Sequence, residues 1–198
     1  MENIRRAPGG YMINQEKKYL INLARESLAY YFKTGRVLTV ASAAVPASCT
    51  EDRGVFVTLT KAGSLRGCIG YILPHGPLYQ SVIDNALNAA LDDPRFPPVA
   101  ADELQELKIE ISILSLPEEL KVNSPSEFLA RLKPGVDGVI LRQGLSQATY
   151  LPQVWQEFKA SAAFLDSLCL KAGLAPGCWQ EPQTSILTYQ AEVFGEAG

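Results

Sequence analysis

The amino-acid sequence predicts an α+β fold with a mostly antiparallel sheet and packed helices. Alternating apolar runs occur in closely spaced pairs separated by short turns that contain glycine, a pattern typical of hairpins. The predicted helices fall between these hairpins at irregular intervals instead of following each strand. A doubly wound parallel sheet, which needs regular alternation of strands and helices, is therefore disfavoured.

The first part of the chain predicts a helix followed by a hairpin. Apolar side chains at spacings of three and four indicate an amphipathic helix over residues 14–35 that ends at Gly35. Apolar and polar residues then alternate over residues 55–60 and again over residues 65–72, with Gly63 in the short stretch between the two runs. This pattern predicts two antiparallel strands joined by a tight turn.

The middle of the chain predicts a second helix, a stiff loop and a strand. Residues 77–91 carry an apolar stripe of mostly small side chains and begin with a proline, which suits a first helical turn. Three prolines in residues 92–98 prevent the helix from continuing and predict an irregular loop. Residues 107–114 alternate without a break, so they predict a strand with one face in the core.

The last part of the chain predicts a short helix, a second hairpin, a helix and a final strand. The run Ser124-Pro125-Ser126-Glu127 has the spacing of a capping box and opens a helix that stops before residues 134–135. The remaining elements are expected at residues 136–143, 147–151, 164–173 and 186–194.

Length and composition indicate an ordinary globular chain. The 198 residues correspond to one domain, with room for a small lobe, at about 150 residues per domain. Hydrophobic residues make up 47% and charged residues 20%, which excludes a disordered or fibrous chain. The net charge of -3 and the lack of a basic stripe argue against a dedicated binder of nucleic acid or of anionic membranes.

Neither a membrane span nor an export signal is expected. No apolar run approaches the roughly 18 to 20 residues of a spanning helix, and the N-terminal residues 1–11 carry charges without an apolar stretch behind them. We therefore expect a soluble, cytoplasmic protein without a membrane partner. Cys49, Cys68, Cys169 and Cys178 form no CxxC motif, and we interpret them as thiols in a reducing cytosol rather than as disulfides.

The hexapeptide LRGCIG, residues 65–70, is the most informative segment for function. Strict strand alternation places Arg66, Cys68 and Gly70 on one face. A guanidinium about 6–7 Å along the strand from a sulfur favours the thiolate, and Gly67 and Gly70 leave room for a ligand or another backbone. Cys68 is therefore a candidate nucleophile, with Arg66 as its partner and anion binder. The alternative is a small buried cysteine in a crowded sheet, with the glycines marking a bulge.

A cysteine nucleophile usually also needs a base. His75, the single histidine, lies between Pro74 and Gly76 and is interpreted as an exposed turn residue. Glu110, in the middle of the strand predicted at residues 107–114, is the better candidate. If that strand neighbours the hexapeptide strand, Glu110 would pair with Arg66 or serve as the general base. A solvated strand carboxylate is the alternative.

Three further residues are candidate ligand contacts. Arg95 lies in the stiff loop, where fixed backbone can aim a guanidinium at a carboxylate or phosphate. A structural bond from Asp92 or Asp93 to nearby backbone is the alternative there. Thr58 and Thr60 could donate hydroxyl hydrogen bonds to a ligand, although threonine is also a good strand former. We expect no metal site and no cofactor, because metal-ligand spacing, GxGxxG and Walker sequences are all lacking.

LRGCIG is also the signature of a family that this chain resembles. The family is named for the AMME chromosomal region gene one product and is called AmmeMemoRadiSam system protein A in bacteria and archaea. Further similar segments lie at residues 54–60, 85–86, 93–96, 103–104, 107–114, 151–154 and 164–174. The resemblance covers about residues 20–194 of what we expect to be a single domain over residues 1–198. It implies a compact α+β fold with one larger and one smaller lobe, and no established biochemical activity.

The resemblance also implies partners. Bacterial and archaeal relatives are often encoded with, or fused to, a Memo-like protein of the extradiol-dioxygenase fold and a radical SAM enzyme, which implies a shared pathway. The present chain lacks a CxxxCxxC motif and a set of two histidines and one carboxylate, so it is expected to be neither partner itself. Arg66, Cys68, Arg95 and Glu110 fall on positions that match the family pattern.

Two functional hypotheses follow. The first is a cytosolic enzyme or enzyme component that acts on a small molecule or a modified residue. In it, Cys68 is the nucleophile, Arg66 the thiolate partner and Glu110 the base of a Cys/Arg-lined pocket. The second is a non-enzymatic adaptor or ligand-binding subunit whose hexapeptide is structural or a docking surface for the Memo-like and radical SAM proteins. Whether the chain is an enzyme stays open on the sequence alone.

Overall fold

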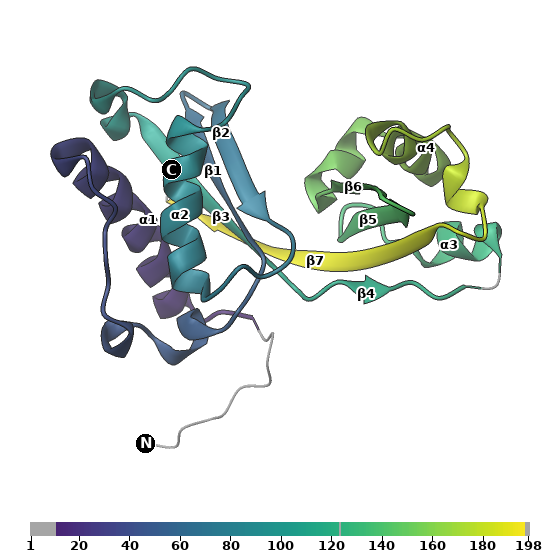
Figure 1. Ribbon diagram of the computed structural model, residues 1–198, viewed down its shortest axis with the longest axis horizontal. Coiled ribbons are helices and arrows are strands. Elements are labelled where there is room, and N and C mark those ends of the chain that lie inside the picture. Colours follow the sequence, from purple (N-terminus) through teal and green to yellow (C-terminus); the bar gives the residue numbers. More distant parts are fainter. Residues whose placement is uncertain (1–10, 123, 197–198) are drawn as a thin grey trace. The chain divides into compact units, whose positions relative to one another are not determined.

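The computed structural model describes residues 11–122 and 124–196, and the chain divides into two compact units (Figure 1). Unit 1, the larger, comprises the described residues up to Leu114 and those from Glu192 onward, and unit 2 comprises Ser115–Ala191. Both units combine helices with antiparallel strands. The expected α+β fold with one larger and one smaller lobe is therefore confirmed.

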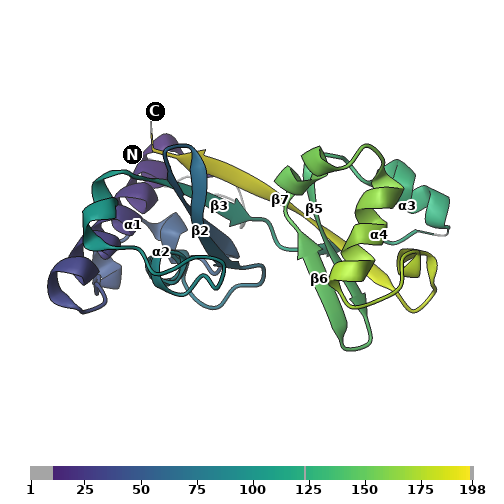
Figure 2. The same cartoon turned by 90° about the horizontal axis from the view of Figure 1, so that it is seen from above.

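In unit 1, two helices cover one face of an antiparallel sheet, as Figures 1 and 2 show from two directions. The strand order is β2–β1–β3, and β7 follows on the far side of β3. The elements are α1 (Asn14–Thr34), β1 (Val55–Lys61), β2 (Ser64–Tyr71), α2 (Leu78–Leu91), β3 (Leu107–Leu114) and the C-terminal end of β7 (Ser185–Gly195). Each of these elements matches an expected one to within about two residues at its ends.

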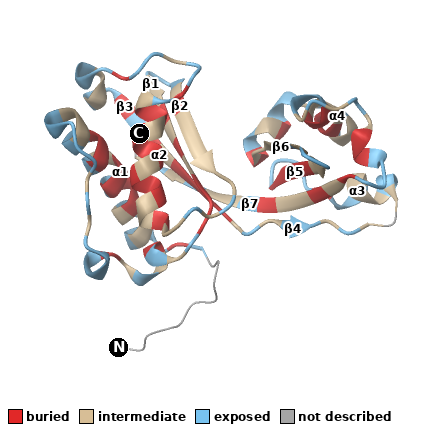
Figure 3. Ribbon diagram, viewed as in Figure 1, coloured by how far each residue is buried: buried red, intermediate tan, exposed pale blue. Residues whose placement is uncertain are grey.

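The core of unit 1 lies between this sheet and the helices (Figure 3). Alternate apolar residues of β1 and β3 face the helices and are at most 1% exposed: Val55, Val57, Leu59, Ile109, Ile111 and Ile113. Helix α1 ends where the N–H of Gly35 donates to the carbonyl of Tyr31 at 2.7 Å. Because strand side chains alternate, the residues between the buried ones point to the opposite face of the sheet.

Unit 2 is built on strands β4, β7, β5 and β6 in that order, with helices α3 and α4. The bounds are β4 (Glu118–Glu119), α3 (Pro125–Arg131), β5 (Asp137–Gln143), β6 (Ser146–Tyr150) and α4 (Ser161–Lys171). The Ser124 hydroxyl accepts the N–H of Glu127, so the expected capping of α3 is confirmed. In the core, the Trp155 ring stacks on Phe164 with 3.7 Å between centroids.

Several short elements were not predicted. They are β4 and the 3-10 turns Ser42–Ala44, Ala47–Thr50, Ala101–Gln105, Pro152–Glu157 and Cys178–Gln180. Runs of two to six residues are too short to display a hydrophobic period. None of the helices in the described ranges is both long and apolar enough to cross a membrane.

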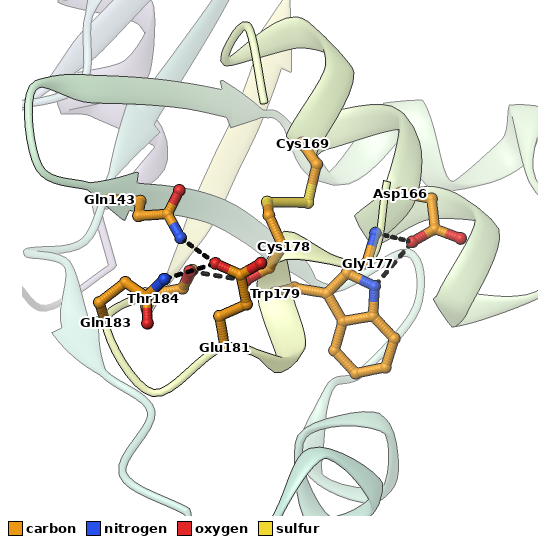
Figure 4. The surroundings of a disulfide bond; sticks show 9 residues. All are labelled: Gln143, Asp166, Cys169, Gly177, Cys178, Trp179, Glu181, Gln183 and Thr184. Carbon is orange, nitrogen blue, oxygen red and sulfur yellow. Dashed lines mark hydrogen bonds between the residues drawn. A yellow bond between two sulfur atoms is a disulfide. The ribbon is translucent and has the colours of Figure 1, made fainter. Parts of the chain in front are cut away.

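The interpretation of all four cysteines as thiols is wrong for one pair, because Cys169 and Cys178 form a disulfide (Figure 4). Their Cα atoms lie 6.1 Å apart, since Gly177 adopts a φ of 86° and turns the chain back toward the end of α4. The carboxylate of Asp166 accepts the Gly177 N–H and the Trp179 indole N–H, both at 2.8 Å. Spacing along the chain gives no sign of this reversal. Among the described residues, Cys49 and Cys68 are free thiols.

Candidate functional site

The hexapeptide forms most of β2, and the strand register builds a row of three candidate residues across the sheet. Cys68 lies opposite Thr58 of β1, and Thr58 lies opposite Glu110 of β3. All three are half-buried and point away from the helices. The Thr58 hydroxyl donates to the Cys68 sulfur at 3.2 Å. The structure thus brings together three of the residues that the sequence singled out.

Arg66 is diverted from this row by a bulge. Leu59 pairs with Gly67 and Thr60 with Leu65, so Arg66 is left without a partner in β1. Its guanidinium instead forms two bonds to the Glu103 carboxylate, at 2.9 and 3.1 Å. Two further N–H groups donate to the carbonyls of residues 97 and 98, at 2.8 and 3.2 Å. The expectation that Arg66 partners the Cys68 sulfur is wrong, because a single extra residue breaks the strand alternation on which it depended. The condition for pairing with Glu110 is not met either, because β1 lies between the hexapeptide strand β2 and β3.

Glu103 lies at the centre of a cluster that it forms with Arg66 and Lys61. It also accepts the N–H of Ala100 at 2.9 Å and the ammonium of Lys61 at 3.3 Å. The bonds from the Arg66 guanidinium, and then from Ala100 N–H, lower the pKa of Glu103 to about 2. Arg66 and Glu103 are 14% and 19% exposed, so this ion pair is largely shielded from water. The pair fixes the segment that follows the stiff loop onto the edge of β2.

The stiff loop itself is bonded to the backbone of Cys68. The Asp93 carboxylate accepts the Cys68 N–H at 2.8 Å, and the Arg95 guanidinium donates to the Cys68 carbonyl at 3.3 Å. Asp93 is 2% exposed and pairs with Arg95 at 2.7 Å, and these bonds hold the pKa of Asp93 far below its usual range. The alternative of a structural bond from Asp93 to nearby backbone is confirmed. Because β2 is an edge strand, the loop also covers backbone groups that another strand would otherwise pair with.

The environment of the Cys68 thiol raises its pKa. Burial raises its pKa, and the negative charges of Asp93 and Glu110 raise it further. The hydrogen bond from Thr58 and the positive charge of Arg95 act in the opposite direction but do not overcome burial. The net effect is a raised pKa, which disfavours the thiolate. The guanidinium whose charge acts on it belongs to Arg95, 27 residues further along the chain, and not to Arg66.

The two glycines of the hexapeptide face opposite sides of the sheet, and neighbouring groups fill the space beside each. A Cβ at Gly67 would collide with the carbonyl oxygen of Ala89 in α2, so the absent side chain lets the helix backbone approach the sheet. A Cβ at Gly70 would collide with the ring of Phe56, which covers it from the neighbouring strand. Of the two expected occupants, a ligand or another backbone, the space at Gly67 holds the backbone of α2, and the space at Gly70 holds the Phe56 ring.

The other candidates lie apart from the row. Thr60 lies beside the bulge, opposite Leu65 and Lys108. His75 is exposed, and its ring contacts that of Tyr71 at 4.3 Å between centroids. No group of three or more His, Cys, Asp or Glu side chains placed to hold a metal ion occurs within residues 11–122 and 124–196.

Two cavities lie away from the hexapeptide. One of about 480 Å³ in unit 1 is lined by residues of α1 and the end of β7, and one of about 710 Å³ in unit 2 adjoins β4, β7 and α3. The residues that sequence reasoning passed over at the site are chiefly Glu103, the partner of Arg66, and Asp93 as a partner of Cys68. Both residues lie in segments that resemble the family, residues 93–96 and 103–104, and this resemblance is the signal that could have found them.

Comparison with known proteins supports the family expected from the hexapeptide. The AMMECR1 family model matches residues 21–194. A protein from Methanothermobacter thermautotrophicus is 41% identical over 184 residues, covering 92% of this chain and 95% of its own length. One from Methanopyrus kandleri is 38% identical over 190 residues, covering 92% and 89%.

A solved structure extends the likeness from sequence to fold. The crystal structure of an uncharacterised protein from Pyrococcus horikoshii superimposes with a TM-score of 0.85 at 36% identity, and covers 93% of both chains. The family model and these relatives span both units of the fold. The chain therefore belongs to the AMMECR1 family.

Proposed function

We propose that this AMMECR1 chain is a non-enzymatic binding component that works with Memo-like and radical SAM proteins, and that its hexapeptide is a structural element of the binding surface. The observation that carries this proposal is the environment of Cys68. Its thiol has a raised pKa and accepts a hydrogen bond from Thr58, and its backbone is held by Asp93 and Arg95.

A cysteine nucleophile requires a thiolate and a base that removes its proton. Glu110 is placed in the row, but its negative charge raises the pKa of Cys68 and so opposes thiolate formation. Arg66, the cation that the nucleophile hypothesis relied on, is bound to Glu103. These contacts support a structural role for the hexapeptide.

The surface beside the hexapeptide supports docking. Leu65 is 43% exposed at the start of the hexapeptide, and the Arg95 side chain is 54% exposed although its charge is anchored by Asp93. Leu65 begins the hexapeptide and Arg95 donates to the carbonyl of Cys68, so an exposed apolar side chain and a held guanidinium both border this segment. Arginine is among the residues enriched in protein interfaces.

The second candidate function is a small-molecule site of an enzyme component at the same row. The observation that favours it is the register itself, which aligns a thiol, a hydroxyl and a carboxylate on one face of β2, β1 and β3. There Cys68 would act on a ligand bound against Thr58 and Glu110, with Arg95 rather than Arg66 supplying the positive charge.

The pH dependence of iodoacetamide labelling at Cys68, mapped by mass spectrometry, separates the two candidates. We expect an apparent pKa above the value of about 8.5 for a free thiol, and a lower one in Glu110→Gln because a charge that raises it is removed. Glu106→Gln is the matched control, since Glu106 is 60% exposed and does not act on Cys68. An apparent pKa well below 8.5 in the native protein would refute the binding proposal and support the enzyme.

Docking is tested by mixing the full chain with purified Memo-like and radical SAM proteins in analytical ultracentrifugation. Leu65→Glu is expected to weaken a complex by at least about tenfold, because a charge is buried at an apolar contact. Leu145→Glu, at a fully exposed position of unit 2, is the control and is expected to leave the complex unchanged. Absence of any complex, or equal effects of both variants, would contradict this docking surface.

A further inference from the structure

The cavity of about 710 Å³ lies wholly in unit 2 and is lined by charges of both signs. Its volume falls within the range of about 300–1,000 Å³ that is typical of small-molecule sites. The polar lining residues that matter for its chemistry are Glu118, Arg131, Lys133, Asp137, Thr188 and Gln190. None of them belongs to the hexapeptide or its bonded partners, so the cavity has no role in the function proposed above.

The two carboxylates lie on the sheet. Glu118 of β4 is opposite Thr188, and Asp137 of β5 is opposite Gln190, two residues further along β7. Because residues two apart on a strand share a face, both carboxylates lie on the same side of the sheet. Asp137 is only 7% exposed, and one of its oxygens accepts the Lys133 N–H at 2.9 Å. Its side chain is thereby held at the cavity wall.

The two cations come from the end of α3 and the turn after it. Arg131 donates to the carbonyl of residue 121 at 2.7 Å and approaches Glu127 at 3.6 Å, on its own helix. Within the described part of the chain, the Lys133 ammonium forms no ion pair. No ion pair joins either cation to Glu118 or Asp137 across the cavity in those same residues. Charges of both signs therefore line one cavity without pairing across it, and the ion pair that Arg131 does form is a long one to a half-exposed side chain of its own helix.

We infer that this cavity binds a small zwitterion of the amino-acid or short-peptide type, with its ammonium on Asp137 and Glu118 and its carboxylate on Arg131 and Lys133. A ligand with a charge of only one sign would pair with either the two carboxylates or the two cations, and would leave the other pair without a partner in the cavity. A zwitterion satisfies both, and carboxylate recognition by a guanidinium is favoured by its paired N–H groups. Leu116 and Leu120 also line the cavity and offer apolar contact to a side chain of the ligand.

The test is a calorimetric titration of the full chain at pH 7 with L-leucyl-L-leucine, N-acetyl-L-leucyl-L-leucine and L-leucyl-L-leucine amide. The free dipeptide carries both charges, the acetylated form only the carboxylate and the amide only the ammonium. We expect the dipeptide to bind and each capped form to bind at least about tenfold more weakly, since a charged hydrogen bond is lost. No binding of the dipeptide at about 10 mM, a concentration roughly ten-thousandfold above a dissociation constant of about 1 μM, would overturn the inference, and so would equal binding of a capped form.

Two variants locate the binding. Asp137→Asn keeps an oxygen for the Lys133 N–H and removes the charge, and Arg131→Gln changes an exposed side chain that is expected to leave folding intact. Both are expected to weaken dipeptide binding by about tenfold or more. Arg142→Gln is the matched control, because Arg142 lies in unit 2 but does not line the cavity. If Arg131→Gln binds as well as Arg142→Gln, the dipeptide binds elsewhere and the inference is wrong. Because this site and Cys68 are in different units, either proposal can fail without the other.

Discussion

Reducing the Cys169–Cys178 disulfide is expected to destabilise unit 2 selectively. The two cysteines are 9 residues apart in sequence, and the loop-closure relation gives about 2.6 kcal/mol at 25 °C for a loop of this size. Both sulfur-bearing residues are buried, at 0% and 3% exposure. The bond connects α4 to the turn that places Trp179 beside Asp166. Without it, the unfolded chain gains conformations that the cross-link excludes, and the free energy of unfolding falls.

The assay uses a property of the sequence: both tryptophans, Trp155 and Trp179, lie in unit 2. Their fluorescence during urea unfolding therefore reports on that unit. With an m-value of about 1 kcal/mol per molar urea for so small a unit, reduction is expected to lower the midpoint by about 2–3 M. Mass spectrometry after alkylation confirms the oxidation state, because the oxidised protein offers Cys49 and Cys68 alone.

The control is the double variant Cys169→Ala with Cys178→Ala. Its midpoint is expected to be insensitive to reductant, and it should lie near that of the reduced wild-type protein or below it, because the smaller side chains also leave space in the core. A wild-type midpoint that stays unchanged after complete reduction would refute the loop-closure reasoning.

Three further predictions concern packing and pH. Gly67→Ala is expected to cost about 1–3 kcal/mol of unit 1 stability by urea unfolding, because its Cβ would meet the backbone of Ala89; an unchanged midpoint would contradict this contact. Trp155→Ala is expected to cost about 3–5 kcal/mol in unit 2, since it removes the stack on Phe164, and circular dichroism melts measure the loss. The pKa of Glu103 is depressed to about 2, so its bond to Arg66 adds stability above the unfolded pKa near 4.5 and loses it as the pH falls toward 2. The stability difference between the wild type and Glu103→Gln should therefore shrink over that range, and a difference that stays constant would argue against the pair.

Arg66 illustrates where reasoning from the sequence reached its limit at the site. The expected strands contained both Cys68 and Glu110, and the register of β2, β1 and β3 is what aligns the two residues through Thr58. Alternation failed for Arg66 because one bulge changes the direction of a side chain, and bulges depend on how a strand pairs. The partner that captures Arg66 lies 37 residues away, a separation that no local pattern covers.

By itself, the sequence determined the elements with strong periodicity, namely the helices α1 and α2 and the strands β1, β2 and β3. Periodicity is local, because each residue needs only its neighbours within one or two turns to show which face is apolar. The sequence likewise determined the family, because the hexapeptide and the similar segments around it can be compared without knowledge of the fold.

Only the tertiary structure decided which distant groups meet. It paired Cys169 with Cys178 through a turn, joined Asp93 to the Cys68 backbone, and returned the end of β7 to unit 1 beside β3. These contacts depend on loop paths and strand register, which are set by the packing of the whole core rather than by the residues on either side.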